Sequence, residues 1–297
     1  MYFIISLLAG IFVSVMIAVN GELTGQYGLH TSSVIIHTVG LVFTSFLVLF
    51  KREKPFKNMR PWYFYISGAV GVATVAFNNY AFRRISLSAM LALVLLGQSA
   101  AGLVFDQYGL LGLPKYPFRK FRLVGIIIMI AGVAVMTETH RFDITAVIFS
   151  FLAGCCIVFT RTLSGRLAEL TSIRISTFFN YVLGLSAALI LFLLLGGSEP
   201  SITEQGISSN LYIYTGGILG ACLILVCNIV VMKIPAFYLS LLMFAGQVFS
   251  GVIIDAFIDK SFSGRLITGG ILVTLGLCTD LLLIRKKSAG SSQDDRK

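Results

Sequence analysis

Two glutamines stand inside apolar stretches of the sequence, and each belongs to the same polar pattern. The pattern places a glutamine, a glycine and an aspartate four residues apart, and it occurs twice, as Gln98, Gly102 and Asp106 and as Gln247, Gly251 and Asp255. Residues spaced in this way share one face of a helix. A buried amide in a bilayer needs hydrogen-bond partners, since an unsatisfied one costs on the order of a few kcal/mol. We therefore expect the two glutamines either to line a central substrate cavity or to bond neighbouring helices.

Other polar side chains inside apolar stretches could complete a binding site for a polar molecule. The candidates carry amides or aromatic and imidazole rings, and they are Asn20, His37, Asn79, Asn180, Tyr181 and Asn228. Asn79 and Asn228 each end a helix face of small residues that favours close packing, so an interhelix bond is the alternative to a place in a cavity. His37 could relay protons, form part of a cavity wall or serve packing alone.

Acidic residues near helix ends are candidates for coupling transport to protons. Glu22 follows Asn20 and Gly21 in the step that ends the first apolar stretch, and the two coupling candidates are Glu22 and His37. The alternative for Glu22 is a solvated charge at the end of a helix. For Asp106 and Asp255 we expect a structural role, in which they bond loop amides or nearby basic residues, and proton coupling is the alternative.

Signatures of metal binding and of common enzyme chemistry are missing from the sequence. All five cysteines lie in apolar stretches, and none has the spacing of metal ligands. No H-E-x-x-H, P-loop or G-x-S-x-G motif is present. We therefore predict a protein that holds no metal or cofactor, is not an enzyme and does not use ATP directly.

The elements that must position these side chains are helices in a membrane. Of the 297 residues, 57% are hydrophobic and only 12% are charged, about half the charged fraction of a soluble protein. A helix needs about 20 apolar residues to cross the hydrocarbon. Continuous apolar stretches of this length, without the alternation of a β-barrel wall, lie near 2–20, 32–50, 61–81, 86–105, 122–138, 144–163, 175–196, 211–231, 235–254 and 266–284.

The chain contains an internal repeat. Two stretches of the first half align with the second half without gaps, 4–41 with 148–185 and 63–106 with 212–255. The matches include glycine, asparagine, glutamine and aspartate, which composition alone would not supply. Each copy has five apolar stretches, and an odd number makes the second copy enter the membrane from the opposite side. The expected units are two inverted five-helix repeats at 1–139 and 142–288, and a disordered tail at 289–297.

The distribution of basic residues predicts the orientation of the chain. The net charge is +10, and lysine and arginine concentrate at 51–60, 115–122 and 285–297, on one side of the predicted membrane. The positive-inside rule places these segments and both termini in the cytoplasm. Segment 197–210, the repeat partner of 51–60, has no basic residue and carries two glutamates, as expected if the copies face opposite ways. The charge therefore indicates a multi-pass protein of the cytoplasmic membrane, and it does not indicate nucleic-acid binding.

Several motifs resemble those of the drug/metabolite transporter superfamily and, within it, the inner-membrane exporter family of the YdcZ type. They are LLAG at 7–10, NGELTGQYG at 20–28, PWYFYISGAVGV at 61–72, GQSAAGLVFDQYGLLGLP at 97–114, RLVGIIIMIAG at 122–132 and GQVFSGVIID at 246–255. The resemblance covers nearly the whole chain. It implies two fused five-helix units, a small-molecule carrier, and fifth and tenth helices at the periphery. The second half departs from the pattern at Ser164, Arg166 and Pro235, so a site built from both copies would be asymmetric.

We therefore predict a secondary transporter, preferably an exporter, that carries a small organic metabolite or drug-like compound by alternating access through a cavity near the middle of the bilayer. Its expected partners are this substrate, the lipid bilayer and, as a candidate coupling ion, the proton. The alternative is a membrane receptor, a scaffold or an intramembrane enzyme that does not transport. The sequence leaves open the substrate, the coupling and the choice between a monomer and a homodimer. It also leaves open whether glycine stripes on the fifth and tenth helices pack internally or between copies.

Overall fold

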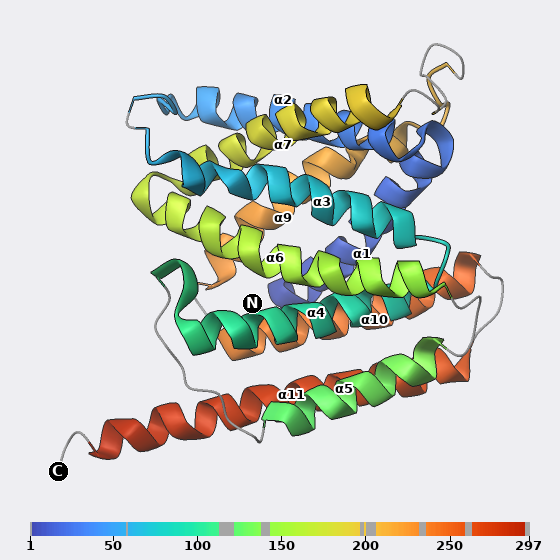
Figure 1. Ribbon diagram of the computed structural model, residues 1–297, viewed down its shortest axis with the longest axis vertical. Coiled ribbons are helices and arrows are strands. Elements are labelled where there is room, and N and C mark those ends of the chain that lie inside the picture. Colours follow the sequence, from blue (N-terminus) through green and yellow to red (C-terminus); the bar gives the residue numbers. More distant parts are fainter. Residues whose placement is uncertain are drawn as a thin grey trace.

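The chain is almost entirely helical. The computed structural model describes residues 2–57, 59–112, 122–137, 143–196, 199, 206–231, 236–258 and 263–294. In these residues the α-helices (Figure 1) are α1 (Tyr2–Tyr27), α2 (Leu29–Phe50), α3 (Ile66–Ala81), α4 (Leu87–Tyr108), α5 (Arg122–Thr137), α6 (Ile144–Leu170), α7 (Ile173–Leu195), α9 (Gly216–Val231), α10 (Ala236–Ile258) and α11 (Gly264–Asp294). The short 3₁₀ helices are η1 (Trp62–Tyr65), η2 (Leu110–Gly112) and η4 (Leu211–Thr215). This part of the chain has no β-strand, so the all-α prediction is confirmed there.

Polar caps and one glycine turn set where several helices begin. Ser86, Asp143 and Ser172 accept hydrogen bonds from first-turn backbone amides of α4, α6 and α7, which have no partner inside the helix. Gly28 alone joins α1 to α2, and its φ of 84° is open to glycine but strained for other residues. These signals are local, and the helices therefore begin within a few residues of the predicted stretches.

Several helices extend beyond the predicted ends, and α6, for example, runs to Leu170. α1 continues through Asn20, Gly21 and Glu22 to Tyr27, so the prediction that this step ends the first helix was wrong. Gly21 serves packing instead: the ring of Phe82 lies against it and leaves no room for a side chain. At the other terminus α11 runs to Asp294, within the segment for which the sequence predicts a disordered tail.

The described helices have the length and surface of membrane spans. Those long and apolar enough to cross a bilayer are α1, α2, α6, α7 and the Leu87–Phe105 part of α4, and shorter apolar helices lie at Leu123–Thr137, Leu211–Val226, Leu242–Ile258 and Gly264–Thr279. Large apolar side chains such as Leu49 and Leu193 are exposed on the surface, which lipid favours and water does not. The chain is a multi-pass membrane protein, and the count of ten spans stays a prediction.

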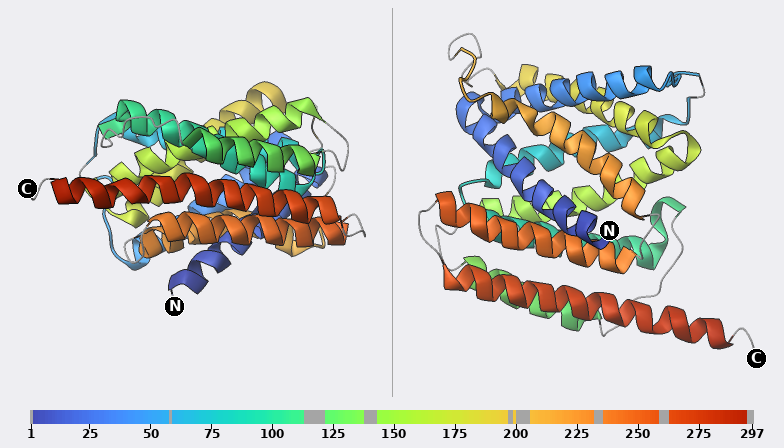
Figure 2. Two further views of the ribbon diagram at one scale, coloured as in Figure 1. Left: turned by 90° about the horizontal axis from the view of Figure 1, so that it is seen from below. Right: turned by 180° about the vertical axis from the view of Figure 1, so that it is seen from behind.

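The helices are stacked in pairs that take one member from each half of the chain. α2 packs on α7, α3 on α6, α1 on α10, and α5 on α11, and Figure 1 shows the succession from α2 and α7 at one end of the molecule to α5 and α11 at the other. The last pair lies at one end, where α5 and α11 pack on each other and against α4 and α10 (Figures 1 and 2). The fifth and last helices are thus peripheral, as the family resemblance implies.

Close backbone contacts recur with the two halves exchanged. Gly10 of α1 packs against the carbonyl of Met243 in α10, and its repeat partner Gly154 of α6 packs against the carbonyl of Val94 in α4. A Cβ at either glycine would collide with that carbonyl. Small residues that let backbones touch are the usual means of holding membrane helices together.

The same exchange relates α3 and α9 to their neighbours. Gly68 of α3 packs against the carbonyl of Asn180 in α7, and Gly217 of α9 packs against the carbonyl of Ile36 in α2. All four residues pair up under the repeat alignment. The predicted packing role of this glycine face is therefore confirmed at these positions.

The glycine stripes of α5 and α11 pack against each other within one chain. A Cβ at Gly132 would lie 2.8 Å from the carbonyl oxygen of Gly269, and one at Gly276 would lie 2.7 Å from that of Gly125. The stripes are thus occupied by internal contacts.

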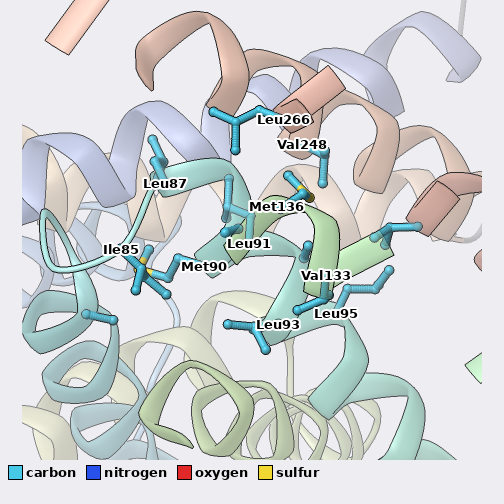
Figure 3. Packing of buried hydrophobic residues seen from close by; sticks show 14 of the residues in the cluster. Ile85, Leu87, Met90, Leu91, Leu93, Leu95, Val133, Met136, Val248 and Leu266 are labelled. Carbon is cyan, nitrogen blue, oxygen red and sulfur yellow. The ribbon is translucent and has the colours of Figure 1, made fainter. Parts of the chain in front are cut away.

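The largest apolar cluster surrounds α4. Figure 3 shows its Met90 and Leu91 among Met136 of α5, Val248 of α10 and Leu266 of α11. Each of these side chains is almost fully buried. This cluster ties the peripheral pair of helices to the rest of the molecule.

A buried carboxylate lies at one edge of this cluster. Asp255 of α10 is 4% exposed and accepts bonds from the backbone amides of Leu87 and Ser88 at 2.6 and 2.8 Å and from the Ser88 hydroxyl at 2.6 Å. The negative charge thus sits at the amino terminus of α4, where the helix dipole favours it. The expected structural role is confirmed for Asp255, and the side chain of Asp106 lies outside the described part.

Candidate functional site

Gln98 and Gln247 occupy equivalent places in α4 and α10. Gly154 packs beside the backbone nitrogen of Gln98, and Gly10 packs beside that of Gln247. Both glutamine side chains are half-buried, and neither amide has a hydrogen-bond partner among the described residues. A role in a substrate cavity stays a prediction for both.

His37 and Tyr181 meet where α2 packs against α7. Their ring centroids lie 5.9 Å apart. His37 is 5% exposed, and its Nδ1 donates to the carbonyl of Ser33 at 2.8 Å. The Tyr181 hydroxyl donates to the carbonyl of Gly217 at 3.0 Å, and the His37 Nε2 lies beside Gly184. The His37 bond therefore stays within α2, whereas the Tyr181 bond joins α7 to α9.

Several buried polar atoms lack a hydrogen-bond partner, and three of them belong to predicted site residues. Within the described part of the chain these atoms are Asn20 Oδ1, Ser33 Oγ, Asn78 Oδ1, Asn79 Nδ2 and Asn180 Oδ1. Each such atom costs roughly 1–3 kcal/mol. A fold that keeps several of them holds water there or retains them for a function.

Two of these amides face a helix of the other half. Asn20 of α1 points its Oδ1 at Gly216, the first residue of α9. Asn180 of α7 points its Oδ1 toward Gly71 of α3, 3.9 Å from where a Cβ would lie. The structure thus places both amides at contacts between the halves, as a site shared by two copies requires.

Sequence reasoning missed two of the unpartnered residues. Ser33 lies one turn from His37, and Asn78 is adjacent to Asn79. Serine and asparagine in helices are commonly satisfied by their own backbone, so only their neighbours could have signalled them. Asn79 is buried near the end of α3, and its repeat partner Asn228 has its side chain outside the described part.

Glu22, the predicted acidic coupling residue, forms an ion pair with Arg83. Both side chains are at least one-third exposed, and the pair lies at the end of α3. This environment favours the alternative of a solvated charge at the surface.

The polar groups inside the described helices are mainly neutral. Apart from the carboxylate of Asp255, the buried ones are amides, hydroxyls and the imidazole of His37, which can hydrogen-bond a polar molecule without presenting a charge to it. No group of His, Cys, Asp or Glu that could hold a metal ion occurs in the residues that were placed. These features define a helical membrane protein with uncharged polar groups at the contacts between its halves.

The family of the chain follows from its sequence. Residues 1–135 and 145–279 match the family described as "Putative inner membrane exporter, YdcZ". The match spans nearly the whole chain, so the protein belongs to this family of inner-membrane exporters. The resemblance drawn from the motifs is confirmed. No curated protein matches the sequence.

The fold also occurs in solved structures. One crystal structure of a protein matches with a TM-score of 0.65 over 96% of this chain and 98% of that chain, at 16% sequence identity. At this identity the likeness shows the fold alone.

Proposed function

We propose that the protein exports a small organic metabolite or drug-like compound as a secondary transporter that works by alternating access. The supporting observation is that contacts between helices recur with the halves exchanged, as for Gly10 with Met243 and Gly154 with Val94. Two equivalent halves that face opposite ways can form one site reached from either side in turn. Export is preferred because the family is one of exporters.

The proposal includes an inverted repeat with units at 1–139 and 142–288. It is supported by the position of two loops that are repeat partners. Segment 51–57 follows the carboxyl end of α2, whereas Glu199, from segment 197–210, contacts the amino end of α2. Repeats of the same orientation would bring both loops to one end. The charge of the loops further supports cytoplasmic termini.

We place the substrate between the halves, among the neutral polar side chains of the inner helices. The proposed contacts are Asn20, His37, Asn79, Gln98, Asn180, Tyr181, Asn228 and Gln247. Asn20 and Asn180 have the strongest support, because each has an unpartnered oxygen that faces the other half. Neutral groups suit a substrate that carries hydroxyl or amide groups better than one with a high net charge.

A ligand screen followed by transport measurements tests this proposal. Compounds that raise the melting temperature of the purified protein are identified, and their movement into reconstituted vesicles is then measured. Gln98→Ala and Gln247→Ala should each weaken the stabilisation by a hit. Ser186→Ala, which removes an exposed hydroxyl that bonds its own helix, should leave it unchanged. Full stabilisation in both glutamine variants would remove these residues from the site.

The same vesicles test coupling. If protons drive transport through Glu22 or His37, an imposed pH gradient should change the rate. A rate that does not respond to the gradient would remove both residues as coupling candidates and favour facilitated diffusion or exchange.

A further inference from the structure

A carboxylate from the second half holds the amino terminus of a helix in the first half. Glu199 accepts bonds from the backbone N–H of His30 at 2.9 Å and of Thr31 at 2.9 Å, and from the Thr31 hydroxyl at 3.3 Å. A Cβ at Gly28 would lie 2.6 Å from the Glu199 carboxyl carbon, so the glycine makes room for it. We call this contact the Glu199 clamp.

A carboxylate from the first half likewise binds the amino end of a helix in the second half, in this case through side chains. Glu53 accepts bonds from the hydroxyl of Ser172, which caps α7, at 2.6 Å and from Nε of Arg174 at 2.6 Å. Arg60 adds a bond from its guanidinium to the carbonyl of Leu170 at 2.9 Å. We call the contact of Glu53 with Ser172 and Arg174 the Glu53 clamp.

The two clamps lie at opposite ends of α2. Glu199 binds its first turn, and Glu53 follows its last residue by three positions. A helix of 22 residues is about 33 Å long, which is close to the thickness of the hydrocarbon. Each clamp therefore joins the halves at one face of the molecule.

Aromatic side chains back each clamp in the same exchanged manner. Beside the Glu53 clamp, Tyr65 of the first half packs edge-on against Phe179 of the second at 4.7 Å between centroids. Beside the Glu199 clamp, Tyr27 of the first half and Tyr214 of the second join their hydroxyls, and both accept from the backbone N–H of Ser208 at 3.0 Å. Tyr65 and Tyr214 are repeat partners.

The clamps differ from the contacts between them in how easily they can be broken. Glu53 is 16% exposed, Arg174 is 40% exposed, and Glu199 is likewise only partly buried, so water can replace the bonds of either clamp when it separates. The ring contact of His37 with Tyr181 and the glycine contacts are buried and closely packed, and separating them would lose van der Waals contacts that nothing replaces. Opening at either end is therefore cheaper than separation at the middle.

We propose that the Glu53 and Glu199 clamps are the two gates of the carrier, each of which must break for the site to open at its end. The proposal rests on the proposed function. Both clamps are engaged in this structure, and each carboxylate, by holding a helix of the other half, biases the protein toward opening at the opposite end. Removing one clamp then shifts the balance toward opening at the end that it held.

Labelling of Cys222 measures this balance without a substrate. Cys222 is a partly buried cysteine of α9, two residues after Gly220, which faces the Tyr181 hydroxyl. A chain that keeps it as the sole cysteine is treated with a membrane-impermeant thiol reagent from one side of a vesicle at a time. Glu53→Ala should raise the labelling rate from the side of the Glu53 clamp relative to the other by about tenfold, the change expected from losing one charge-assisted interaction. Glu199→Ala should shift the ratio the opposite way.

Three further variants serve as controls for this measurement. Glu169→Ala removes an exposed carboxylate that pairs with Arg166 within α6, and it should leave the ratio unchanged. Glu53→Gln and Glu199→Gln keep an acceptor oxygen, and they should give smaller shifts in the same directions even if an alanine variant fails to fold. Equal ratios in all well-folded variants, or shifts of the same sign at both clamps, would overturn the gates.

The outcome separates the gates from the proposed function. Unchanged labelling in a protein that moves a compound across vesicles would overturn the gates and leave the carrier standing. Opposite labelling shifts in a protein that moves no compound of the screen would support the gates and count against the carrier.

Discussion

Buried polar groups have hydrogen-bond partners in one region of this molecule and lack them in another. Around α4, where α5, α10 and α11 pack, the apolar cluster is dense and the buried carboxylate of Asp255 has three donors. Around α2 and α7, Asn180 and Ser33 keep buried atoms without partners. The first region is built for stability. The second carries an energetic cost that fits a place occupied by water or by a substrate, and it supplies Asn180 to the proposed substrate contacts.

The densest contacts should be the most sensitive to added volume. Gly154→Val places a branched side chain against the carbonyl of Val94, where no space exists. We expect a loss of roughly 3 kcal/mol or more, because the helices α4 and α6 cannot separate locally. The melting temperature in detergent measures it. Gly165→Val in the same helix is the matched control, since nothing lies within 4 Å of its Cβ position. Equal losses in both variants would contradict close packing at Gly154.

The buried cap of α4 should cost more to remove than the exposed cap of α6. Asp255→Ala leaves the amides of Leu87 and Ser88 buried without their acceptor, and we expect a loss of about 2–3 kcal/mol. Asp143→Ala removes a cap whose side chain is 28% exposed, so water replaces it and the loss should be about 1 kcal/mol. Thermal unfolding of both variants gives the comparison. A smaller effect at Asp255 would show that burial does not decide the value of these caps.

Substitution of an amide without a hydrogen-bond partner should raise the stability, whereas the substitutions above lower it. Asn180→Leu replaces a buried oxygen that has no partner with an apolar group of similar size. We expect a gain of about 1 kcal/mol in stability, together with loss of the stabilisation by any ligand from the screen. Asn210→Leu, at an exposed position, is the control for a change in side-chain type alone. Destabilisation by Asn180→Leu would indicate that the amide holds ordered water or bonds a part of the chain outside the described residues.

Much of the fold could be predicted because its signals are local. Continuous apolar stretches predict the helices, and Ser86, Asp143 and Ser172 stand where three of them begin. The repeat alignment also placed His37 and Tyr181 at matching positions, and equivalent residues near a two-fold relation tend to meet. A contact between two residues at matching repeat positions could therefore be predicted from the alignment.

The two clamps and part of the proposed site could not be predicted, because the residues that form them contact partners that are far away in the sequence and that no sequence motif indicates. Glu53 and Glu199 read as ordinary loop charges. Their partners are backbone amides, two hydroxyls and the Arg174 guanidinium, all of them more than 100 residues away in the sequence. Gly21 reads as a helix end, and its contact with the ring of Phe82, which explains why a glycine stands there, could not be read from the sequence. Whether a buried asparagine finds a partner depends on its neighbours in space, so Asn78 carried no distinguishing signal.

The smallest effect should come from the exposed acid that the sequence made a coupling candidate. Glu22 pairs with Arg83 at the surface, where water competes for both charges. Glu22→Gln should therefore change the stability by less than about 0.5 kcal/mol, and Arg83→Gln should change it by a similar amount. Transport by Glu22→Gln vesicles should respond to a pH gradient as the unmodified protein does. If the variant transports but its rate no longer responds to the gradient, Glu22 takes part in the coupling. The coupling would then depend on an exposed ion pair and not on the buried amides without partners.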